Sequence, residues 1–268
     1  MAENISVHIA MAMLVIACLS CGEVDKPISE DPPETFIETR LNEHSLVTNI
    51  YLDIQWRGSQ YVDEFSYRCE EIPDLSDWSQ WSNETSVKLE YLDQGDYTFE
   101  VKGRYAEDNE DESPATLMFT VDFDGPGVLL KPLKKKLILG EKFALEIMAD
   151  DVTDLMVAHL LLHYDPAQLE AQSVIPGAVF EGSKTPLFFS TIDASQGIID
   201  ISMSTAGATP SRIQGTEPIA VVRFKSLSVG ESPISFDEKS EFFDSAGKPV
   251  SIINRIDGVV EVTEKIGN

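Results

Sequence analysis

The amino-acid sequence predicts an all-β chain that contains two consecutive β-sandwich domains. Short runs in which apolar and polar residues alternate fill residues 35–262, and Gly, Pro, Asn and Asp separate the runs. This pattern is typical of antiparallel sheets that pack face to face. The acidic residues, which give a net charge of −26, are concentrated in the first half and so indicate two units. This charge excludes a nucleic-acid partner, because phosphate binding needs clustered Lys and Arg.

Residues 1–21 are predicted to be an export signal. The apolar run 9–21 is shorter than the roughly 20 residues of a membrane-spanning helix and suits the centre of a signal peptide. The stretch 15–18, Val-Ile-Ala-Cys, resembles a bacterial lipobox, and Cys21 ends a second, looser match. The resemblance implies cleavage before Cys18 or Cys21 and lipidation of that thiol. The first eight residues contain no Lys or Arg, which departs from the pattern and leaves a secreted protein or an uncleaved anchor as alternatives.

Residues 22–34, "GEVDKPISEDPPE", are predicted to be a flexible tether. They are polar, contain three prolines and show no apolar periodicity. Fully extended, they reach at most about 45 Å. We therefore expect an exported protein that a lipid anchor holds to the cell envelope or cell surface.

The first predicted sandwich covers residues 35–123. Its strand candidates alternate with a period of two, for example with Tyr97, Phe99 and Val101 on one face. The candidate strand runs are 45–58, 64–71, 85–92, 96–106 and 115–123. Cys69 lies in the second of them and is expected to be a small buried hydrophobic residue, with no disulfide in the folded part.

The motif "LDQGDYTFEV", residues 92–101, resembles the L-x-x-G-x-Y signature of fibronectin type III and related triple-tyrosine domains. The resemblance covers nearly all of the first unit. It implies that Tyr97 is structural, with its hydroxyl bonded to nearby backbone, and that Trp78 or Trp81 packs against the domain. The alternative for the tryptophans is a sugar-stacking platform. The acidic run 107–112 lacks the spacing and the turn glycine of a calcium loop, so a charged loop is the favoured interpretation.

The second predicted sandwich covers residues 124–268 and begins with a hinge at 124–127, "DGPG". Phe143, Leu145, Ile147 and Ala149 alternate with other residues and predict a half-buried strand. Later strand candidates lie within 186–207, with a turn at 195–197, and within 219–227, 232–252 and 256–262.

The apolar stretch 154–164 within "DLMVAHLLLHYDPAQLE" is ambiguous between helix and strand, and its neighbours favour a strand. Pro166 ends it, because the residue before a proline avoids helical geometry. The period of two puts four residues on an inner face and four on an outer face. The inner residues are Ala158, Leu160, Leu162 and Tyr164, and the outer residues are Val157, His159, Leu161 and His163.

The second unit resembles a cohesin domain in the order of its motifs along almost its full length. The matching stretches are Gly140-Glu141, "YDPAQLE" at the end of the apolar strand, "FFSTIDASQGIIDIS", "AVVRFKSLSVGESPISF" and "DSAGKPV". The resemblance implies a jelly-roll sandwich of about nine strands. It also implies a non-catalytic module that docks a protein partner, a dockerin, which carries its own calcium.

By this resemblance one sheet face binds the partner. The implied partner-binding residues are Val157, His159, Leu161, His163, Ser190, Ile192, Asp200 and Ser202. Val157 and His159 stand where some cohesins have polar or acidic residues, which leaves the partner's identity open. The alternative is that the chain's own first unit or a loop covers this face. The two histidines lie about 13 Å apart on an extended strand, too far to share one metal ion, so no metal site is predicted.

The predicted function is therefore a cell-surface lipoprotein that docks a partner such as a dockerin-bearing, polysaccharide-degrading enzyme. No nucleophile, metal-hydrolase or nucleotide motif is present, so we expect no enzyme activity and no cofactor of its own. The alternative function is direct polysaccharide binding by the sandwiches, for which Trp78 and Trp81 are the candidate residues.

Overall fold

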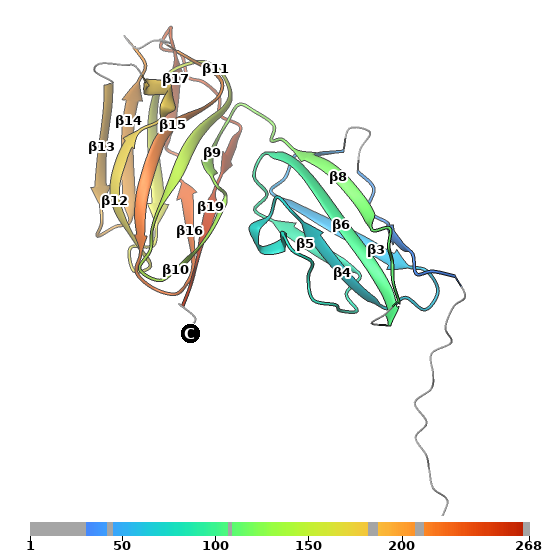
Figure 1. Ribbon diagram of the computed structural model, residues 1–268. Coiled ribbons are helices and arrows are strands. Elements are labelled where there is room, and N and C mark those ends of the chain that lie inside the picture. Colours follow the sequence, from blue (N-terminus) through green and yellow to red (C-terminus); the bar gives the residue numbers. More distant parts are fainter. Residues whose placement is uncertain (1–30, 42–44, 107–108, 182–186, 207–211, 265–268) are drawn as a thin grey trace, which may run out of the picture.

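The computed structural model describes residues 31–41, 45–106, 109–181, 187–206 and 212–264. The predicted signal, both candidate lipidation cysteines (Cys18 and Cys21) and most of the tether lie outside these ranges. Within them, no helix is long and apolar enough to cross a bilayer. Nearly all regular structure is β, in sandwiched sheets, which confirms the predicted fold class. Figure 1 shows two units joined at one end.

The first unit packs a sheet ordered β1-β3-β5 against a sheet ordered β2-β8-β6-β4, with β7 paired to β6. Its elements are β1 (Thr35–Ile37), β2 (Leu46–Val47), β3 (Tyr51–Gly58), β4 (Glu64–Cys69), η1 (Pro73–Leu75), β5 (Ser86–Glu90), β6 (Gly95–Ala106), β7 (Asn109–Glu110) and β8 (Ala115–Val121). Trp56 and Phe99 are buried at its centre, where their ring centroids lie 5.9 Å apart. Cys69 is a buried free thiol, as predicted, and burial raises its pKa to about 12.

Tyr97 ties β6 back to the preceding turn. Its hydroxyl donates a hydrogen bond of 2.9 Å to the backbone oxygen of Asp93, and its ring stacks on Phe119. This is the bond that the resemblance to fibronectin type III domains implied for Tyr97. Phe99 and Val101 share its buried face, so the predicted period of two in this strand is confirmed.

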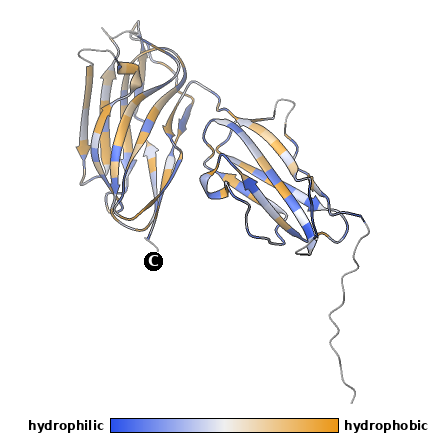
Figure 2. Cartoon of the chain, viewed as in Figure 1, coloured by the Kyte–Doolittle hydropathy of each residue, from blue (hydrophilic) through white to orange (hydrophobic). Residues whose placement is uncertain are grey.

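The second unit is a network of eleven hydrogen-bonded strands. Its elements are β9 (Gly127–Lys131), β10 (Lys134–Ile138), β11 (Lys142–Tyr164), β12 (Leu169–Pro176), η2 (Ala178–Phe180), β13 (Leu187–Asp193), β14 (Ile198–Ser204), β15 (Ile213–Ser226), β16 (Gly230–Phe236), β17 (Glu241–Asp244), β18 (Asn254–Ile256) and β19 (Gly258–Thr263). Figure 2 shows hydrophobic and hydrophilic residues interspersed along these strands, as expected where one side of a strand meets a core.

The long strand β11 belongs to both layers of this sandwich. Its first half pairs with β9 and β15, and its second half pairs with β14, β16 and β17. Between the halves, Asp151 and Asp154 have positive φ angles of 45° and 59°, and the pairing with β15 shifts register there. These irregularities bend the strand from one layer into the other. The alternation pattern predicts two separate strands, and the structure instead has one continuous strand with a corner.

The two units are in direct contact. Leu129, Leu133 and Met148 of the second unit join the buried cluster of the first. The backbone N–H of Leu133 donates a bond of 2.8 Å to the carboxylate of Asp93, and burial raises the pKa of Asp93. The side chain of Gln94 donates to Asp150 at 3.2 Å. The domain boundaries 35–123 and 124–268 remain a proposal.

Candidate functional site

The candidate site is the outer side of the second half of β11, which the sequence analysis chose as the docking face. Residues 157–163 are extended, as predicted. Ala158, Leu160 and Leu162 are buried in the core of the second unit. Val157, His159, Leu161 and His163 alternate with them and are partly exposed on the other side.

Strand β14 extends this face on one side. It pairs with β11 in antiparallel register, so that Ser202 lies opposite His159 and Asp200 lies opposite Leu161. The carboxylate of Asp200 accepts a hydrogen bond of 3.0 Å from the Nε2 atom of His159. The predicted position of Asp200 and Ser202 beside the β11 residues is therefore confirmed, while their role in binding stays a prediction.

The predicted position of Ser190 and Ile192 on the same face is wrong. Strand β13 pairs with β14 so that Ser190 lies opposite Ile201 and Ile192 lies opposite Ile199, two core residues. Residues directly opposite one another point to the same side of a sheet, so Ser190 and Ile192 belong to the inner side. Ile192 packs against the core cluster.

The outer side of β13 instead carries Phe189 and Thr191, which lie opposite Ser202 and Asp200. The sequence analysis missed both residues. Phe189 is 69% exposed, and Leu187, farther along the same side, is 46% exposed. A three-residue turn at 195–197, as predicted, would pair residue 194 with 198 and even-numbered with even-numbered residues, which gives Ser190 and Ile192. The structure instead pairs Asp193 with Ile198 across a four-residue turn, and this one-residue difference brings Phe189 and Thr191 to the outer side.

On the other side of β11, the face continues onto β17 and the end of β16. Phe243 lies opposite Val157, and Glu241 lies opposite His159. The carboxylate of Asp237 accepts a hydrogen bond of 2.8 Å from the Nε2 atom of His163. The backbone N–H of Lys239 and the His163 side chain together hold the pKa of Asp237 below its usual range.

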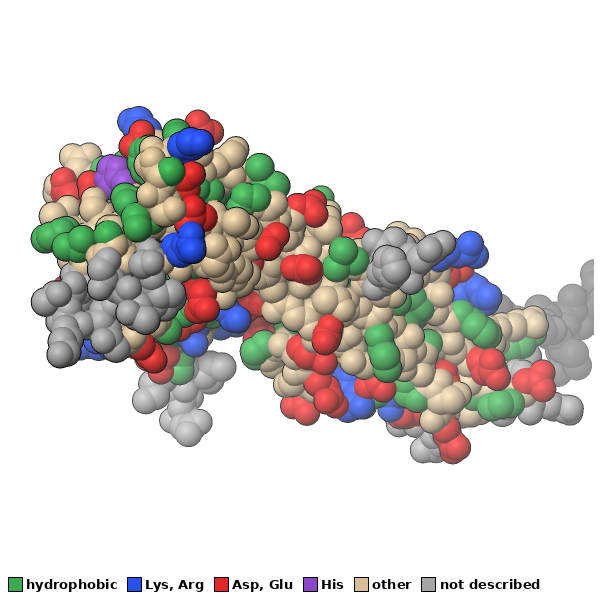
Figure 3. All heavy atoms as spheres, turned by 90° about the horizontal axis from the view of Figure 1, so that it is seen from above, with side chains coloured by type: hydrophobic (Ala, Val, Ile, Leu, Met, Phe, Trp, Pro, Cys, Tyr) green, Lys and Arg blue, Asp and Glu red, His purple; other side chains and the backbone are tan. Residues whose placement is uncertain are grey.

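The docking face is defined as the outer residues of β13, β14, the second half of β11 and β17. On it, the apolar residues Val157, Leu161, Phe189 and Phe243 are interspersed with histidine, serine and acidic side chains. The second unit meets the first through other residues, namely Leu129, Leu133 and Met148. The described residues of the first unit therefore do not cover the docking face. Figure 3 shows histidine beside hydrophobic side chains at the end of the molecule away from the first unit.

The second candidate site lies on the first unit, at Trp78 and Trp81. Arg68 and Lys102 lie over the Trp78 ring at 4.8 and 4.9 Å, and Lys102 and Arg104 lie over Trp81 at 5.3 and 4.4 Å. Each indole is thus engaged by two cations of its own domain. This arrangement matches the predicted packing role better than a sugar-stacking role, because sugar binding needs a free ring face.

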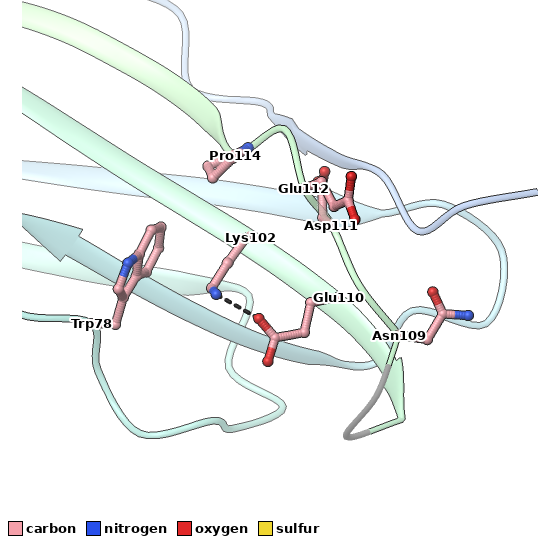
Figure 4. A pocket seen from close by; sticks show the side chains of 7 residues that line it. All are labelled: Trp78, Lys102, Asn109, Glu110, Asp111, Glu112 and Pro114. Atoms are coloured by element: carbon pink, nitrogen blue, oxygen red, sulfur yellow. Dashed lines mark hydrogen bonds and ion pairs between the residues drawn. The ribbon is translucent and has the colours of Figure 1, made fainter.

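A pocket of about 550 Å³ opens beside Trp78 and is lined by Lys102, Asn109, Glu110, Asp111, Glu112 and Pro114. Figure 4 shows Lys102 directed at Glu110, with which it forms an ion pair of 2.6 Å. The predicted acidic loop lies here, although residues 107 and 108 are outside the described ranges. Among the described residues, no group of three or more His, Cys, Asp or Glu side chains is suited to hold a metal ion.

Comparison with known proteins identifies residues 134–262 as a match to the family model of the cohesin domain. This match confirms the predicted resemblance for the second unit. The search of curated proteins gave no match.

Similar solved structures are also cohesins. One is a non-cellulosomal cohesin from the archaeon Archaeoglobus fulgidus, with 15% identity over 52% of this chain and 91% of that chain and a TM-score of 0.43. Another is the sixth cohesin of scaffoldin B from Acetivibrio cellulolyticus in complex with a dockerin, with 16% identity, 52% and 100% coverage and a TM-score of 0.46. A third is a type I cohesin–dockerin complex from Clostridium thermocellum, with 20% identity, 51% and 94% coverage and a TM-score of 0.43.

Proposed function

We propose, from the premise that residues 134–262 form a cohesin domain, that this chain is a non-catalytic docking protein whose partner carries a dockerin-like module. The observation that carries the proposal is the docking face. Its apolar residues Val157, Leu161 and Phe189 are partly or largely exposed, although each lies on a strand of the sandwich. Exposed apolar and aromatic side chains beside polar groups that can form hydrogen bonds are typical of a protein interface.

The polar groups of the docking face would fix the orientation of the bound partner. Asp200 and Asp237 are each held by a histidine, at 3.0 and 2.8 Å, so their carboxylates have defined positions. Fixed polar groups in an interface contribute specificity and orientation more than affinity. The exposed apolar residues are then the main source of binding energy.

We further propose that the chain is exported, lipidated at Cys18 or Cys21, and held at the cell surface. The partner would be a polysaccharide-degrading enzyme with its own calcium-loaded dockerin. The first unit, similar to fibronectin type III domains, would hold the docking face away from the anchor. The support for these finer points is the N-terminal sequence and the family match of the second unit.

The rival function is direct polysaccharide binding, with Trp78 and Trp81 as its platform. The cations that lie over both rings argue against it. Affinity electrophoresis through gels that contain soluble polysaccharides tests it, because retardation of the chain would support the rival. Lack of retardation leaves docking as the better account.

The docking proposal is tested by a pair of matched variants. Phe189→Asp puts a charge into the docking face, and Met118→Asp puts the same charge on the first unit at a side chain of equal exposure, 69% in both cases. We expect Phe189→Asp to weaken partner binding by at least about 2 kcal/mol, roughly 30-fold, which is the size of an interface hot spot. Leu161→Asp should act in the same direction, and the melting temperature of Phe189→Asp should hardly change.

The partner for this measurement is recovered by pull-down from the source cell's secretome, with and without a calcium chelator. Recovery of a dockerin-bearing protein only in the presence of calcium supports the proposal. Equal binding by the Phe189→Asp and Met118→Asp chains would show that the partner uses another surface.

A further inference from the structure

Two neighbouring turns at one end of the second unit expose four aliphatic side chains. Ile138 is the last residue of β10 and Leu139 the first of the turn between β10 and β11, and their exposed fractions are 36 and 44%. Leu227 and Val229 belong to the turn between β15 and β16, with 44 and 47% exposed. Large apolar side chains that gather at turn apices, where polar residues are the rule, indicate an interaction site. We call these four residues the aliphatic tip.

The aliphatic tip is a built structure in which the backbone of both turns is tied together. Ser226, which is buried, accepts the Gly140 N–H at 2.8 Å and donates to the Ile138 oxygen at 3.2 Å. The Leu139 N–H donates to Thr263, and the Leu227 N–H donates to Gln168. The backbone of both turns is therefore bonded within the unit, and the four aliphatic side chains lie outward beside the exposed Glu141, whose carboxylate accepts the Ile138 N–H at 3.0 Å.

Two lysines stand directly behind the aliphatic tip. Lys142 and Lys225 lie opposite one another at the end of the β11–β15 ladder, an arrangement that like charges disfavour. Neither forms an ion pair within the described residues, although Glu170 lies opposite Lys225 on its other side. A pair of free lysines is unusual in a chain with a net charge of −26, and an anionic ligand would relieve their repulsion.

Acyl chains and anionic headgroups occur together at a lipid surface, and the aliphatic tip offers a matching group to each. The N-terminal sequence adds a reason to expect such a surface nearby, because the apolar run 9–21 precedes the described chain by about ten residues. In Figure 1 the β10–β11 turn lies at the lower end of its unit, and the described chain begins at the lower end of the other unit.

We propose that the aliphatic tip inserts into the surface of the bilayer to which the chain is anchored, with Lys142 and Lys225 at the level of anionic headgroups. The aliphatic tip would be a second point of membrane attachment in addition to the N-terminal anchor. It would hold the second unit, and with it the docking face, in one orientation relative to the membrane. The inference uses the proposed anchor only to bring the chain to a membrane and does not depend on the docking partner.

The test uses the full chain reconstituted into vesicles of phosphatidylcholine and phosphatidylglycerol whose acyl chains are brominated, since bromine quenches indole emission on contact. Leu139→Trp and Val229→Trp each place an indole at the tip. Ile253→Trp is the matched control. Ile253 is 58% exposed, but its backbone N–H donates a hydrogen bond to the Pro126 oxygen, so it lies at the hinge and away from the aliphatic tip. The three native tryptophans are common to all variants.

We expect the introduced indole at positions 139 and 229 to be blue-shifted and quenched, and that at position 253 to emit as in buffer. Equal quenching at all three positions, or a shift without quenching, which would indicate contact between protein molecules, overturns the proposal. Vesicles of phosphatidylcholine alone should reduce the quenching, and unchanged quenching there overturns the role of the lysines. A chain that does not sediment with the vesicles overturns the anchor, while one that sediments without quenching at the tip overturns only the tip.

Discussion

The carboxylate of Asp237 shows how a single residue on the docking face carries a measurable signature. It accepts hydrogen bonds from the Lys239 N–H and from His163, both at 2.8 Å. These bonds lower its pKa from the ordinary value of 3.8. A group whose pKa is lower in the folded state stabilises the fold above its ordinary pKa, and this stabilisation is lost as the pH falls through the lowered value.

We therefore predict that Asp237→Asn lowers the melting temperature at neutral pH and has no effect in acid below the lowered pKa. Glu238→Gln is the control, because Glu238 is exposed and has no hydrogen bond or ion pair within the described residues. Melting curves recorded from neutral to strongly acidic pH measure both. A deficit of Asp237→Asn that persists undiminished into acid would mean that the amide disturbs packing and that the charge is not the cause.

At the scale of elements, the β13–β14 turn fixes the register of the docking face. Gly197 has φ = +66°, and a Cβ atom there would lie 2.1 Å from the Tyr164 backbone oxygen at the end of β11. Gly247 has a similar φ of +72°, but a Cβ there would meet nothing within 4 Å. The two glycines thus separate backbone strain from steric conflict.

We predict that Gly247→Ala costs about 1–2 kcal/mol of stability, from the left-handed backbone alone. Gly197→Ala should cost about 2–5 kcal/mol, because overpacking adds about 1–3 kcal/mol to the same strain. Urea denaturation measures both free energies of unfolding. Equal losses for the two variants would show that the β13–β14 turn can move away from Tyr164 without cost.

The strands were largely predictable from the sequence, and the errors have physical causes. Alternation placed Leu160 and Leu162 inside correctly, because one side of β11 meets a core and the other does not. It failed for Ser190 and Ile192, because β13 is an edge strand with apolar and polar residues on both sides. Period alone cannot select the inner side of such a strand.

The contact between units could not be predicted from alternation either. Alternation with Phe143, Leu145, Ile147 and Ala149 places Met148 on the outer side of its strand, and the structure buries it in the cluster of the first unit. The corner in β11 was not predicted either, because the alternation of residues 143–149 and that of residues 157–164 indicate two strands and contain no sign that they are continuous. Both features depend on tertiary contacts that a single strand's pattern does not contain.

At the scale of the whole molecule, Leu133 makes the stability of the first unit depend on the second. It is fully buried in the first unit's cluster although it precedes β10. We predict that Leu133→Ala costs about 2–5 kcal/mol and lowers the melting midpoint of the first unit. Tryptophan fluorescence measures this midpoint selectively, because Trp56, Trp78 and Trp81 all belong to the first unit.

The control for this prediction is Leu145→Ala, which removes an equally buried leucine from the separate core of the second unit. If the units unfold separately, Leu145→Ala should leave the tryptophan midpoint unchanged while Leu133→Ala shifts it. A common shift in both variants would show that the whole chain unfolds in one step. No shift with Leu133→Ala would contradict the coupling.

The corner in β11 has a kinetic consequence for the second unit. Because one uninterrupted backbone segment supplies a member to each layer, neither layer can open by itself without disturbing the other. Solvent deuterium should then reach the amides on both sides of the corner at one common, slow rate, set by opening of the entire sandwich. Among the described strands, β13 pairs with β14 alone and should exchange its amides much sooner. The docking face would thus combine strand β11, whose amides exchange slowly, with strand β13, whose amides exchange rapidly.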